Sequence, residues 1–421
     1  MKASISKSEI GGRVTAPPSK SYTIRGLVYA ALARGQSSLV HPLGSDDTEA
    51  TIRVLGQLGV PTRQRAKSWL VAGGGFHQPD GELYCGESAA TLRFLTAVSS
   101  LVPGRCRLSA GPSLSRRPVR PLIDALRQLG VNCSCQGDFP PVTVEGRTLK
   151  GGLTALAGNI SSQFVSALLF VSPLAEKGVT IRLTTPLESK PYVLMTLDAM
   201  QWFGVSVAFS PELDEFNILR QSYRPTRFRV EGDWSSASYF LALGALAGEV
   251  EVKNLSAQSL QADKVLVDFL KEMGASVTLS QKSVRVSQSS LRAIRADLSQ
   301  CIDLLPTMAV LAAVANGTSQ FTGIERARIK ESDRVAAVCQ GRERMGIRVA
   351  QQGDKLMITG GKPRGALIDS RNDHRIAMAF SLLGVVAGGT IIEPAECVSK
   401  TYPEFWEVLR SIGGEVKING K

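Results

Sequence analysis

The chain has 421 residues, 43% of them apolar and 20% charged, and carries a formal net charge of +12. A chain of this size can bury a large core, and at roughly 100–200 residues per domain it predicts two or three domains. Aromatic residues make up only 6%, and Lys and Arg are spread along the chain without a block of like charges. These features argue against a basic tail and against nucleic acid as a partner, and they favour small acidic ligands.

Cysteine usage and the N-terminal residues indicate the compartment. The seven cysteines are scattered, with Cys133 and Cys135 as their closest pair, a pattern typical of free thiols in a reducing compartment. The first residues, MKASISKSEIGG, contain no apolar core like that of a signal peptide. The longest apolar run, 376–392, is interrupted by glycines and is shorter than the ~20 residues of a membrane span. We therefore expect a soluble, cytoplasmic protein, and the three scattered histidines give no support to a metal site.

Two series of glycines divide the chain into repeats. Members of the first series follow helix-like segments such as LGQLGV and LRQLGV, 67 to 74 residues apart: Gly59, Gly130, Gly204, Gly274, Gly346 and Gly413. Members of the second series lie between them, 69 to 74 residues apart: Gly35, Gly104, Gly178, Gly248, Gly317 and Gly389. Glycine just past a helix supplies the left-handed conformation that ends it, and β-prone residues follow each one. The chain therefore predicts six repeats of about 70 residues, each with two helices and several strands.

The first, Ala/Leu-rich helix of each repeat is predicted to begin at a polar cluster. In chain order these clusters are PPSKSYTIR (17–25), GESAATLR (86–93), GNISSQF (158–164), GDWSSASYF (232–240), CIDLLP (301–306) and NDHRIAM (372–378). Equivalent helices start at equivalent places, so their N-termini can converge, and converging N-termini attract anions. Four cations stand near these helix starts, namely Lys20, Arg25, Arg93 and Arg375. A cation there opposes the helix dipole, which favours a bound anion beside it.

Each polar cluster also has an ordinary structural interpretation. Ser161-Ser162, Asp233 and Asp303 could each simply cap a helix. The string IKESDR (329–334) could be a solvated helix face of paired charges. The argument for a binding site therefore depends on the recurrence of polar clusters at one point of the repeat.

Seven motifs between residues 14 and 408 resemble those of one enzyme family. They are PSKSYTIR, GNISSQF, LESKPY (187–192), VEGD (230–233), IKESDR, NDHRIAM and SKTYPEFW (399–406). Together they resemble the 5-enolpyruvylshikimate-3-phosphate (EPSP) synthase family, also called 3-phosphoshikimate 1-carboxyvinyltransferases. The resemblance implies an α/β (α+β) fold, a two-lobed inside-out barrel of six βαβαββ repeats, three per lobe. It assigns 1–17 and 232–421 to the C-terminal lobe and 18–231 to the N-terminal lobe, with a hinge near 17–18 and 230–233.

The reaction implied by the resemblance joins two anionic small molecules. The enolpyruvyl group of phosphoenolpyruvate would move to the 5-hydroxyl of shikimate 3-phosphate through a tetrahedral ketal, releasing phosphate, in aromatic amino-acid biosynthesis. Each substrate carries a phosphate and a carboxylate, which guanidinium groups suit. Motif matching assigns phosphoenolpyruvate to Lys20, Ala89, Arg117, Gln163, Arg334, Arg375 and Lys400. It assigns shikimate 3-phosphate to Lys20, Ser21, Arg25, Ser161, Ser162, Gln163, Ser189, Tyr192, Asp303, Arg326 and Lys330.

The same resemblance implies three catalytic residues. Asp303 is the candidate base at the 5-hydroxyl, and Glu331 the group that protonates and then deprotonates the methyl carbon. Lys20 would assist the departing phosphate, and the division of proton transfers between Lys20 and Glu331 stays open. The family needs no metal or organic cofactor and is habitually monomeric. Because the residues assigned to shikimate 3-phosphate come from both lobes, Ser21 and Arg25 from one and Asp303 and Lys330 from the other, we expect the lobes to close when it binds.

The segment GESAATLRF (86–94) departs from the family pattern. It has Glu87 for Asn, Ala89 for Gly and Phe94 for Pro. Glyphosate, an inhibitor of the family, is slightly longer than phosphoenolpyruvate, so the methyl group of Ala89 predicts reduced sensitivity to it. Glu87 is not assigned to a substrate, and pairing with a neighbouring cation is one interpretation of this residue. Arg326 stands where many members have Asn, which adds a donor.

Three other functions are weighed against this one. UDP-N-acetylglucosamine enolpyruvyl transferase shares the fold but uses a cysteine five residues before an Arg-Pro pair. Here Pro112 occupies that place before Arg117-Pro118, and AGPSLSRRP contains no cysteine. RNA 3′-terminal phosphate cyclase needs a nucleophilic histidine that the sequence does not suggest. A non-enzymatic nucleic-acid binder is supported by the net charge alone.

Overall fold

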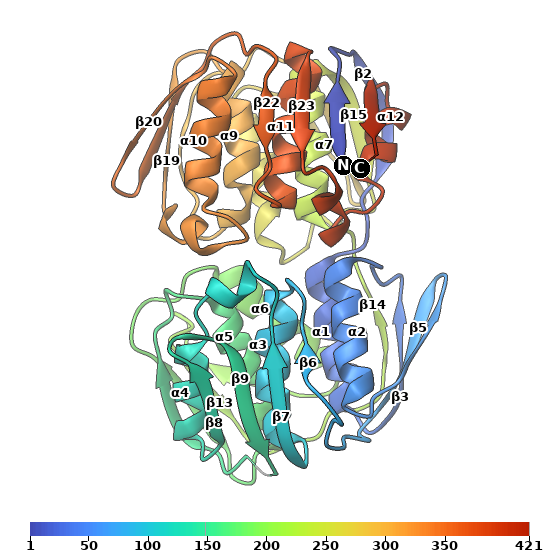
Figure 1. The fold of residues 1–421 in the computed structure, drawn as a ribbon, viewed down its shortest axis with the longest axis vertical. Helices are drawn as coiled ribbons and strands as arrows, with labels where there is room; N and C mark the ends of the chain where they lie inside the picture. The colour runs from blue at the N-terminus through green and yellow to red at the C-terminus, as the bar shows by residue number, and fades with distance from the viewer. Residues whose placement is uncertain (148, 421) are drawn as a thin grey trace. The chain divides into compact units, whose positions relative to one another are not determined.

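The computed structural model describes residues 1–147 and 149–420 of the chain. The chain separates into two compact units, shown in Figure 1. Unit 2 is the single segment Pro18–Glu231, and unit 1 combines Met1–Pro17 with the chain from Gly232 onward.

Unit 2 contains three repeats of the same topology. Their helices are α1 (Lys20–Leu32), α2 (Asp46–Gln57), α3 (Ala89–Val98), α4 (Arg120–Gln128), α5 (Ser162–Val171) and α6 (Lys190–Trp202), with short 3-10 turns η1 (Ser99–Leu101), η2 (Leu114–Arg116) and η3 (Ser172–Leu174). Their strands are β3 (Gly35–Val40), β4 (Thr62–Arg65), β5 (Ser68–Gly73), β6 (Leu83–Tyr84), β7 (Gly104–Ser109), β8 (Asn132–Gln136), β9 (Phe139–Gly146), β10 (Gly152–Leu156), β11 (Val179–Leu183), β12 (Ala208–Phe209), β13 (Glu215–Ile218) and β14 (Arg227–Arg229). The strands form the sheets β14-β3-β5-β4, β6-β7-β9-β8 and β10-β11-β13-β12. In each sheet the first two strands run parallel and the other pairs antiparallel, which is the βαβαββ pattern.

Unit 1 repeats this plan. Its helices are α7 (Trp234–Ala247), α8 (Leu266–Glu272), α9 (Leu305–Val314), α10 (Arg334–Arg344), α11 (His374–Ala387) and α12 (Phe405–Ser411), with 3-10 turns η4 (Ala262–Val265), η5 (Ile302–Leu304), η6 (Glu325–Ile329) and η7 (Glu396–Lys400). Its strands are β1 (Lys2–Ile5), β2 (Ile10–Thr15), β15 (Gly248–Lys253), β16 (Ser276–Leu279), β17 (Ser283–Ser287), β18 (Arg295–Asp297), β19 (Thr318–Thr322), β20 (Arg348–Gln352), β21 (Lys355–Thr359), β22 (Leu367–Asp369), β23 (Thr390–Glu393) and β24 (Val416–Asn419). They form the sheets β2-β15-β17-β16, β18-β19-β21-β20 and β22-β23-β1-β24. The fold prediction of six βαβαββ repeats, three per unit, is therefore confirmed.

Two strands leave the repeat to which their place in the sequence would assign them. Strand β2 precedes α1 in the chain but pairs with β15, which follows α7. Strand β14 precedes α7 but pairs with β3, which follows α1. In Figure 1 the blue β2 lies beside β15 in unit 1, and the yellow-green β14 lies in unit 2. The N-terminal strand β1 supplies the last strand of the sixth repeat, between β23 and β24.

The glycine series occupy the helix ends as predicted. All six members of the first series have positive φ, from +77° at Gly346 to +102° at Gly413. Five of the second series do so as well, and Gly178 is the exception. A Cβ atom at Gly178 would lie 3.0 Å from the carbonyl oxygen of Ile218, so this glycine permits a close backbone approach.

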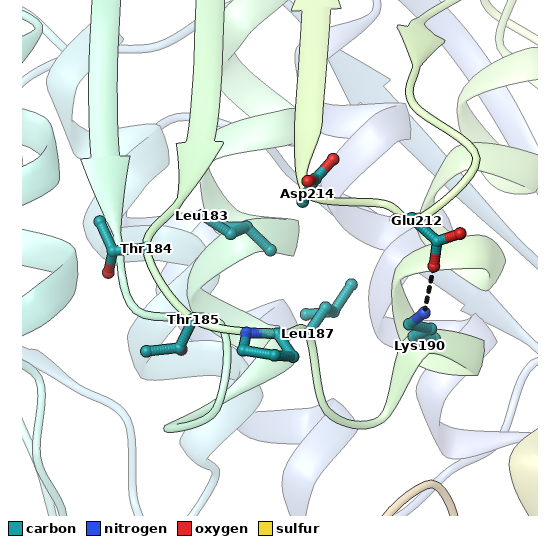
Figure 2. Close-up of a pocket in the computed structure, with 8 residues that line it drawn as sticks. Leu183, Thr184, Thr185, Leu187, Lys190, Glu212 and Asp214 are labelled. Carbon is teal, nitrogen blue, oxygen red and sulfur yellow. Dashed lines mark ion pairs between the residues drawn. The ribbon is translucent and has the colours of Figure 1, made fainter.

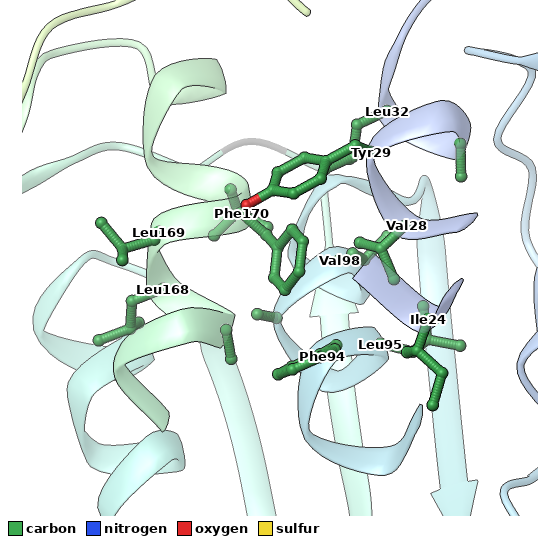
Figure 3. Close-up of a cluster of buried hydrophobic side chains, with 14 of the residues drawn as sticks. Ile24, Val28, Tyr29, Leu32, Phe94, Leu95, Val98, Leu168, Leu169 and Phe170 are labelled. Atoms are coloured by element: carbon green, nitrogen blue, oxygen red, sulfur yellow. The ribbon is translucent and has the colours of Figure 1, made fainter. Parts of the chain in front are cut away.

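The first helix of each repeat is apolar on nearly every side, which is why it is buried. In unit 2 the core joins α1, α3 and α5: the Tyr29 and Phe170 rings are 4.5 Å apart, and those of Phe94 and Phe170 are 4.7 Å apart. Figure 3 shows these rings between the three helices. Helices α7, α9 and α11 are buried in the same way in unit 1. Each unit thus keeps its first helices inside and its sheets outside.

Candidate active site

The first helices of unit 2 begin at the predicted polar clusters, and each is capped by serine. The hydroxyls of Ser19, Ser88 and Ser161 accept hydrogen bonds from backbone N–H groups of α1, α3 and α5. The cap interpretation of Ser161 is thus correct. The Ser161 hydroxyl also accepts from Arg93 Nη1, 3.2 Å away, so capping does not exclude a place in the site.

Arg93 on α3 connects three predicted segments. Its Nη1 donates to Gln163 Oε1 at 2.8 Å, and its Nη2 donates to the carbonyl oxygen of Pro118 at 3.2 Å. Its Cζ lies 4.8 Å from the centre of the Phe164 ring. Arg93 therefore joins α3 to α5 and to the loop that carries the buried Arg117.

Lys20 forms an ion pair that the sequence did not indicate. Its Nζ lies 2.9 Å from Asp47 Oδ2, in the first turn of α2. An acid in a helix's first turn is expected in any case, because it favours the helix dipole, so Asp47 carried no signal of a site. The Thr91 hydroxyl donates to the Asp47 carbonyl oxygen at 3.3 Å, which connects α2 to α3.

Arg25 is buried and donates hydrogen bonds to predicted residues of α1 and α6. Its Nη1 donates to the carbonyl oxygen of Ser21 at 3.1 Å, and its Nη2 donates to that of Tyr192 at 2.9 Å. Its Nε donates to the Thr196 hydroxyl at 2.9 Å. Burial lowers the pKa of Arg25, and the guanidinium lies 5.5 Å from the ring of Phe94, where the family pattern has Pro. Phe94 thus adds a cation–π contact to Arg25.

Glu87 binds backbone groups of the loop that leads to Arg117. Its carboxylate accepts from the N–H groups of Ser113 at 3.1 Å and Leu114 at 2.8 Å. A Cβ atom at Gly111 would lie 2.3 Å from Glu87 Oε1, so the loop fits closely around this carboxylate. Fixing the loop explains the acid at this position, and its predicted pairing with a cation stays a prediction. Ala89 is the first residue of α3 and is buried.

In unit 1, three cations form ion pairs with Asp303. Arg334 Nη1 and Lys330 Nζ lie 2.7 and 3.2 Å from its Oδ1, and Arg375 Nη2 lies 3.2 Å from its Oδ2. Burial favours the protonated form of Asp303, but Arg375, Lys330 and Arg334 outweigh it and hold the pKa well below the usual range. Asp303 is therefore an ionised carboxylate and not a helix cap.

Arg334, the first residue of α10, is 1% exposed and surrounded by carboxylates. Its Nη2 lies 2.6 Å from Glu331 Oε2, and its Nε lies 2.8 Å from Asp373 Oδ2. Burial works against the cation, yet the acids Asp373, Glu331 and Asp303 raise the pKa of Arg334. The interpretation of IKESDR as a solvated helix face is wrong, because its charges take part in this network. Burial lowers the pKa of Lys330 to about 8 despite the opposing effect of Asp303.

Arg375 shows why NDHRIAM begins a helix with a cation. Asp373 is the N-cap of α11 and accepts from the Arg375 N–H at 3.0 Å. The Arg375 side chain pairs with Asp303 and lies 3.5 Å from the hydroxyl of Tyr239 on α7. The carboxylates around the first turn thus offset the unfavourable interaction of the Arg375 charge with the positive end of the helix dipole.

The remaining predicted residues are placed by the elements that carry them. Arg326 donates to the Ser299 carbonyl oxygen, and the buried Lys400 ends η7. Ser189 is the N-cap of α6 with a φ of +55°, and Ser162 is the first residue of α5.

A separate surface pocket of about 380 Å³ lies beside the start of α6. Figure 2 shows it between the end of β11 and the ion pair of Lys190 and Glu212, whose Nζ and Oε2 are 3.7 Å apart. Its lining residues are Leu183, Thr184, Thr185, Pro186, Leu187, Lys190, Glu212 and Asp214, which include none of the predicted site residues.

Two features are not found within residues 1–147 and 149–420. No group of three or more His, Cys, Asp and Glu side chains is arranged to hold a metal ion. No helix there is both long enough and apolar enough to cross a membrane.

Comparison with known proteins identifies the family. The profile of the family described as EPSP synthase (3-phosphoshikimate 1-carboxyvinyltransferase) matches residues 5–409. The chain belongs to the EPSP synthase family. The 3-phosphoshikimate 1-carboxyvinyltransferase of Dehalococcoides mccartyi is 51% identical over 418 residues, 99% of each chain. That of Methanosarcina mazei is 41% identical over 429 residues, again 99% of each chain.

A solved EPSP synthase has the same fold. The structure from Acinetobacter baumannii matches with a TM-score of 0.83 and 26% identity, covering 99% of this chain and 100% of that one. The resemblance to the EPSP synthase family and the predicted fold are thereby confirmed. Sequence analysis did not assign Asp47, Arg93, Asp373 and Tyr239, which the structure joins to assigned residues.

Proposed function

We propose that the chain transfers the enolpyruvyl group of phosphoenolpyruvate to the 5-hydroxyl of shikimate 3-phosphate and releases phosphate. The observation that carries the proposal is 51% identity over 99% of the length of a 3-phosphoshikimate 1-carboxyvinyltransferase. The charged residues around Lys20 and Arg25 in unit 2 and around Asp303 in unit 1 support the proposal. In them, cations suited to phosphate and carboxylate lie beside acids suited to proton transfer.

Substrate binding is assigned by the match to the family's motifs. Phosphoenolpyruvate is bound by Lys20, Ala89, Arg117 and Gln163 of unit 2 and by Arg334, Arg375 and Lys400 of unit 1. Shikimate 3-phosphate is bound by Lys20, Ser21, Arg25, Ser161, Ser162, Gln163, Ser189 and Tyr192 of unit 2 and by Asp303, Arg326 and Lys330 of unit 1. The hydrogen bonds among Arg25, Ser21 and Tyr192 support the second assignment.

Proton transfer is assigned to unit 1. Asp303 takes the proton of the 5-hydroxyl as its oxygen attacks C2 of phosphoenolpyruvate, and Glu331 gives a proton to C3. The ketal then expels phosphate while the C3 proton returns to Glu331, and Lys20 assists the leaving phosphate. A carboxylate with three cations is a weak base, so an anion that takes over Arg375 or Lys330 strengthens Asp303. The base is thereby activated by substrate binding.

We further propose that units 2 and 1 are the N- and C-terminal lobes, with a hinge near 17–18 and 230–233. The lobes close when shikimate 3-phosphate binds, and the protein acts as a monomer in the cytoplasm. Small-angle scattering should give a smaller radius of gyration with both substrates present; an equal radius contradicts closure.

A phosphate-release assay tests the function directly. Phosphate should appear only when phosphoenolpyruvate and shikimate 3-phosphate are both present, and omission of either one is the control. Release without shikimate 3-phosphate, or none with both, contradicts the proposal. A nucleic-acid binder would instead bind labelled oligonucleotides with a steep salt dependence.

A further inference from the structure

The segment Ser259–Asp263 places the buried side chains of Gln261 and Asp263 against the start of α7. Gln261 Oε1 accepts from the Trp234 N–H at 3.0 Å, and its Nε2 donates to the Gly232 carbonyl oxygen at 2.7 Å. The Ser235 hydroxyl donates to Asp263 Oδ2. Because Gly232 begins the second part of unit 1, this segment fixes the chain where it enters that unit.

Asp263 is an acid in an unfavourable place. It is 1% exposed, and its Oδ1 is buried without a hydrogen-bond partner among the residues that the structure describes. A buried carboxylate with so few donors is costly when ionised, whereas the neutral acid loses far less on burial. The geometry therefore favours a proton on this group.

The charges that face Asp263 come from three elements. Asp233 lies at the start of α7, Asp303 in η5 and Arg375 on α11. The Cys301 thiol is also near enough for Asp263 to raise its pKa. Helix α8, which follows Asp263 in the chain, carries its own charges at the exposed positions Asp268, Lys271 and Glu272. Arg375 thus favours ionisation of Asp263, and Asp303 and Asp233 oppose it.

These surroundings raise the pKa of Asp263 toward neutral pH. Burial, aided by Asp303 and Asp233, raises the pKa of Asp263 from its ordinary value of 3.8 to about 7, while Arg375 and the bond from Ser235 lower it. The Asp263 carboxyl group therefore changes from its neutral to its ionised form near pH 7.

We propose that Asp263 is a positioning residue whose proton leaves the charge of Arg375 available to an anionic substrate. Neutral Asp263 holds Ser235 at the start of α7 and does not compete for Arg375. Ionised Asp263 attracts Arg375 and opposes the incoming anion. By linkage, an anion that binds Arg375 raises the affinity of Asp263 for a proton, so binding takes up a proton from solvent. The choice of phosphoenolpyruvate as this anion rests on the proposed function.

The first test measures stability and needs no substrate. Asp263→Asn keeps the shape and an acceptor oxygen but is neutral at every pH. Between about pH 4 and 7 the unfolded chain loses the Asp263 proton while the folded chain keeps it, so the wild type loses stability as pH rises. The melting temperature of the variant, relative to wild type, should therefore rise across this interval and level off above it. A difference that is constant with pH overturns the proposal.

Two further variants locate the effect. The exposed Asp268→Asn, in the next helix, should reproduce the pH dependence of the wild type. In an Arg375→Gln background the cation that favours ionised Asp263 is gone, so the rise produced by Asp263→Asn should extend to higher pH. An unchanged interval would show that Asp263 and Arg375 are not coupled.

The second test measures KM and kcat for phosphoenolpyruvate at pH 6 and 8.5. Comparing the variant with wild type at each pH cancels the ionisation of the substrate itself. The wild-type KM, divided by that of Asp263→Asn, should rise about fivefold between the two pH values, the lower end of usual coupling between sites. The kcat ratio should stay constant, whereas a merely structural role would change both at every pH. If no transfer occurs but the stability curves behave as stated, the proposed function fails and the proton on Asp263 stands.

Discussion

The two units share one architecture but hold their cations differently. In unit 1, Arg334, Arg375 and Lys330 are paired with carboxylates. In unit 2, Arg25 and Arg93 donate to hydroxyl, amide and carbonyl oxygens, and Lys20 pairs with Asp47. Under the proposed function, unit 2 chiefly binds anions, whereas unit 1 supplies the groups that transfer protons and exchanges its internal ion pairs for those with substrate.

The largest effect is expected at Asp303, the shared partner of three cations. Asp303→Asn removes both the negative charge and the proposed base, so kcat should fall by about 10²–10⁴-fold. The matched variant Asp47→Asn removes the acid beside Lys20 and should cost less. Steady-state kinetics of both, with melting curves to check folding, decide the matter. A greater loss in Asp47→Asn would reverse the roles that we assign to the units.

Lys20 tests the binding role of unit 2. Lys20→Met keeps much of the side-chain stem but removes the charge that we propose assists the departing phosphate. We expect kcat/KM to fall by at least about 100-fold, or about 3 kcal/mol of transition-state stabilisation. Turnover within about a factor of three of the wild type would place Lys20 outside the site.

Helix α10 allows a test of acid pairing within unit 1. Like Arg334 at its start, Arg342 near its end is fully buried, but the hydrogen bond that Arg342 donates goes to the Ala309 carbonyl oxygen and not to a carboxylate. Its Nε and Nη1 have no hydrogen-bond partner in the part of the chain that the structure describes. Burial lowers the pKa of Arg342 to about 9, so its guanidinium group is still charged at pH 7. Unlike Arg334, it is not held by carboxylates among the residues that the structure describes.

Arg342→Met should therefore stabilise the protein, by about 1–4 kcal/mol in the free energy of unfolding. The matched change Arg334→Met leaves buried carboxylates without their cation and should destabilise by about 3–5 kcal/mol. Urea denaturation at pH 7 measures both. If Arg342→Met destabilised as much as Arg334→Met, pairing with acids would not explain how unit 1 tolerates buried arginine.

The smallest effect concerns the shape of unit 2 at Ala89. Removing its methyl group in Ala89→Gly should lower the glyphosate inhibition constant relative to the phosphoenolpyruvate KM by about 10–200-fold. The inhibitor is the longer molecule, so the methyl should obstruct it more than the substrate. Inhibition assays on both proteins give this ratio, and an unchanged ratio would show that Ala89 does not limit the pocket.

The sequence predicted features that depend on neighbouring residues better than those that depend on distant ones. Gly346 and Gly413 ended helices as predicted, because a left-handed turn is a local requirement. Asp373 could be recognised as a cap, but its bond to Arg334 joins residues 39 positions apart. Arg342 reads as an ordinary charged helix residue, and only packing reveals its burial. The exchange of β2 and β14 was implied by the family resemblance, since neither strand's own residues specify its partner.

The strand β1 has a consequence for how the chain can be cut and rejoined. Because Lys2 pairs with Asn419 in adjacent strands, a short linker could join the two ends without disturbing the sheet. Opening such a ring between Glu231 and Gly232 would make each unit one continuous stretch of chain, with all strands of its sheets present. A circular permutant could therefore supply the two units as separate polypeptides.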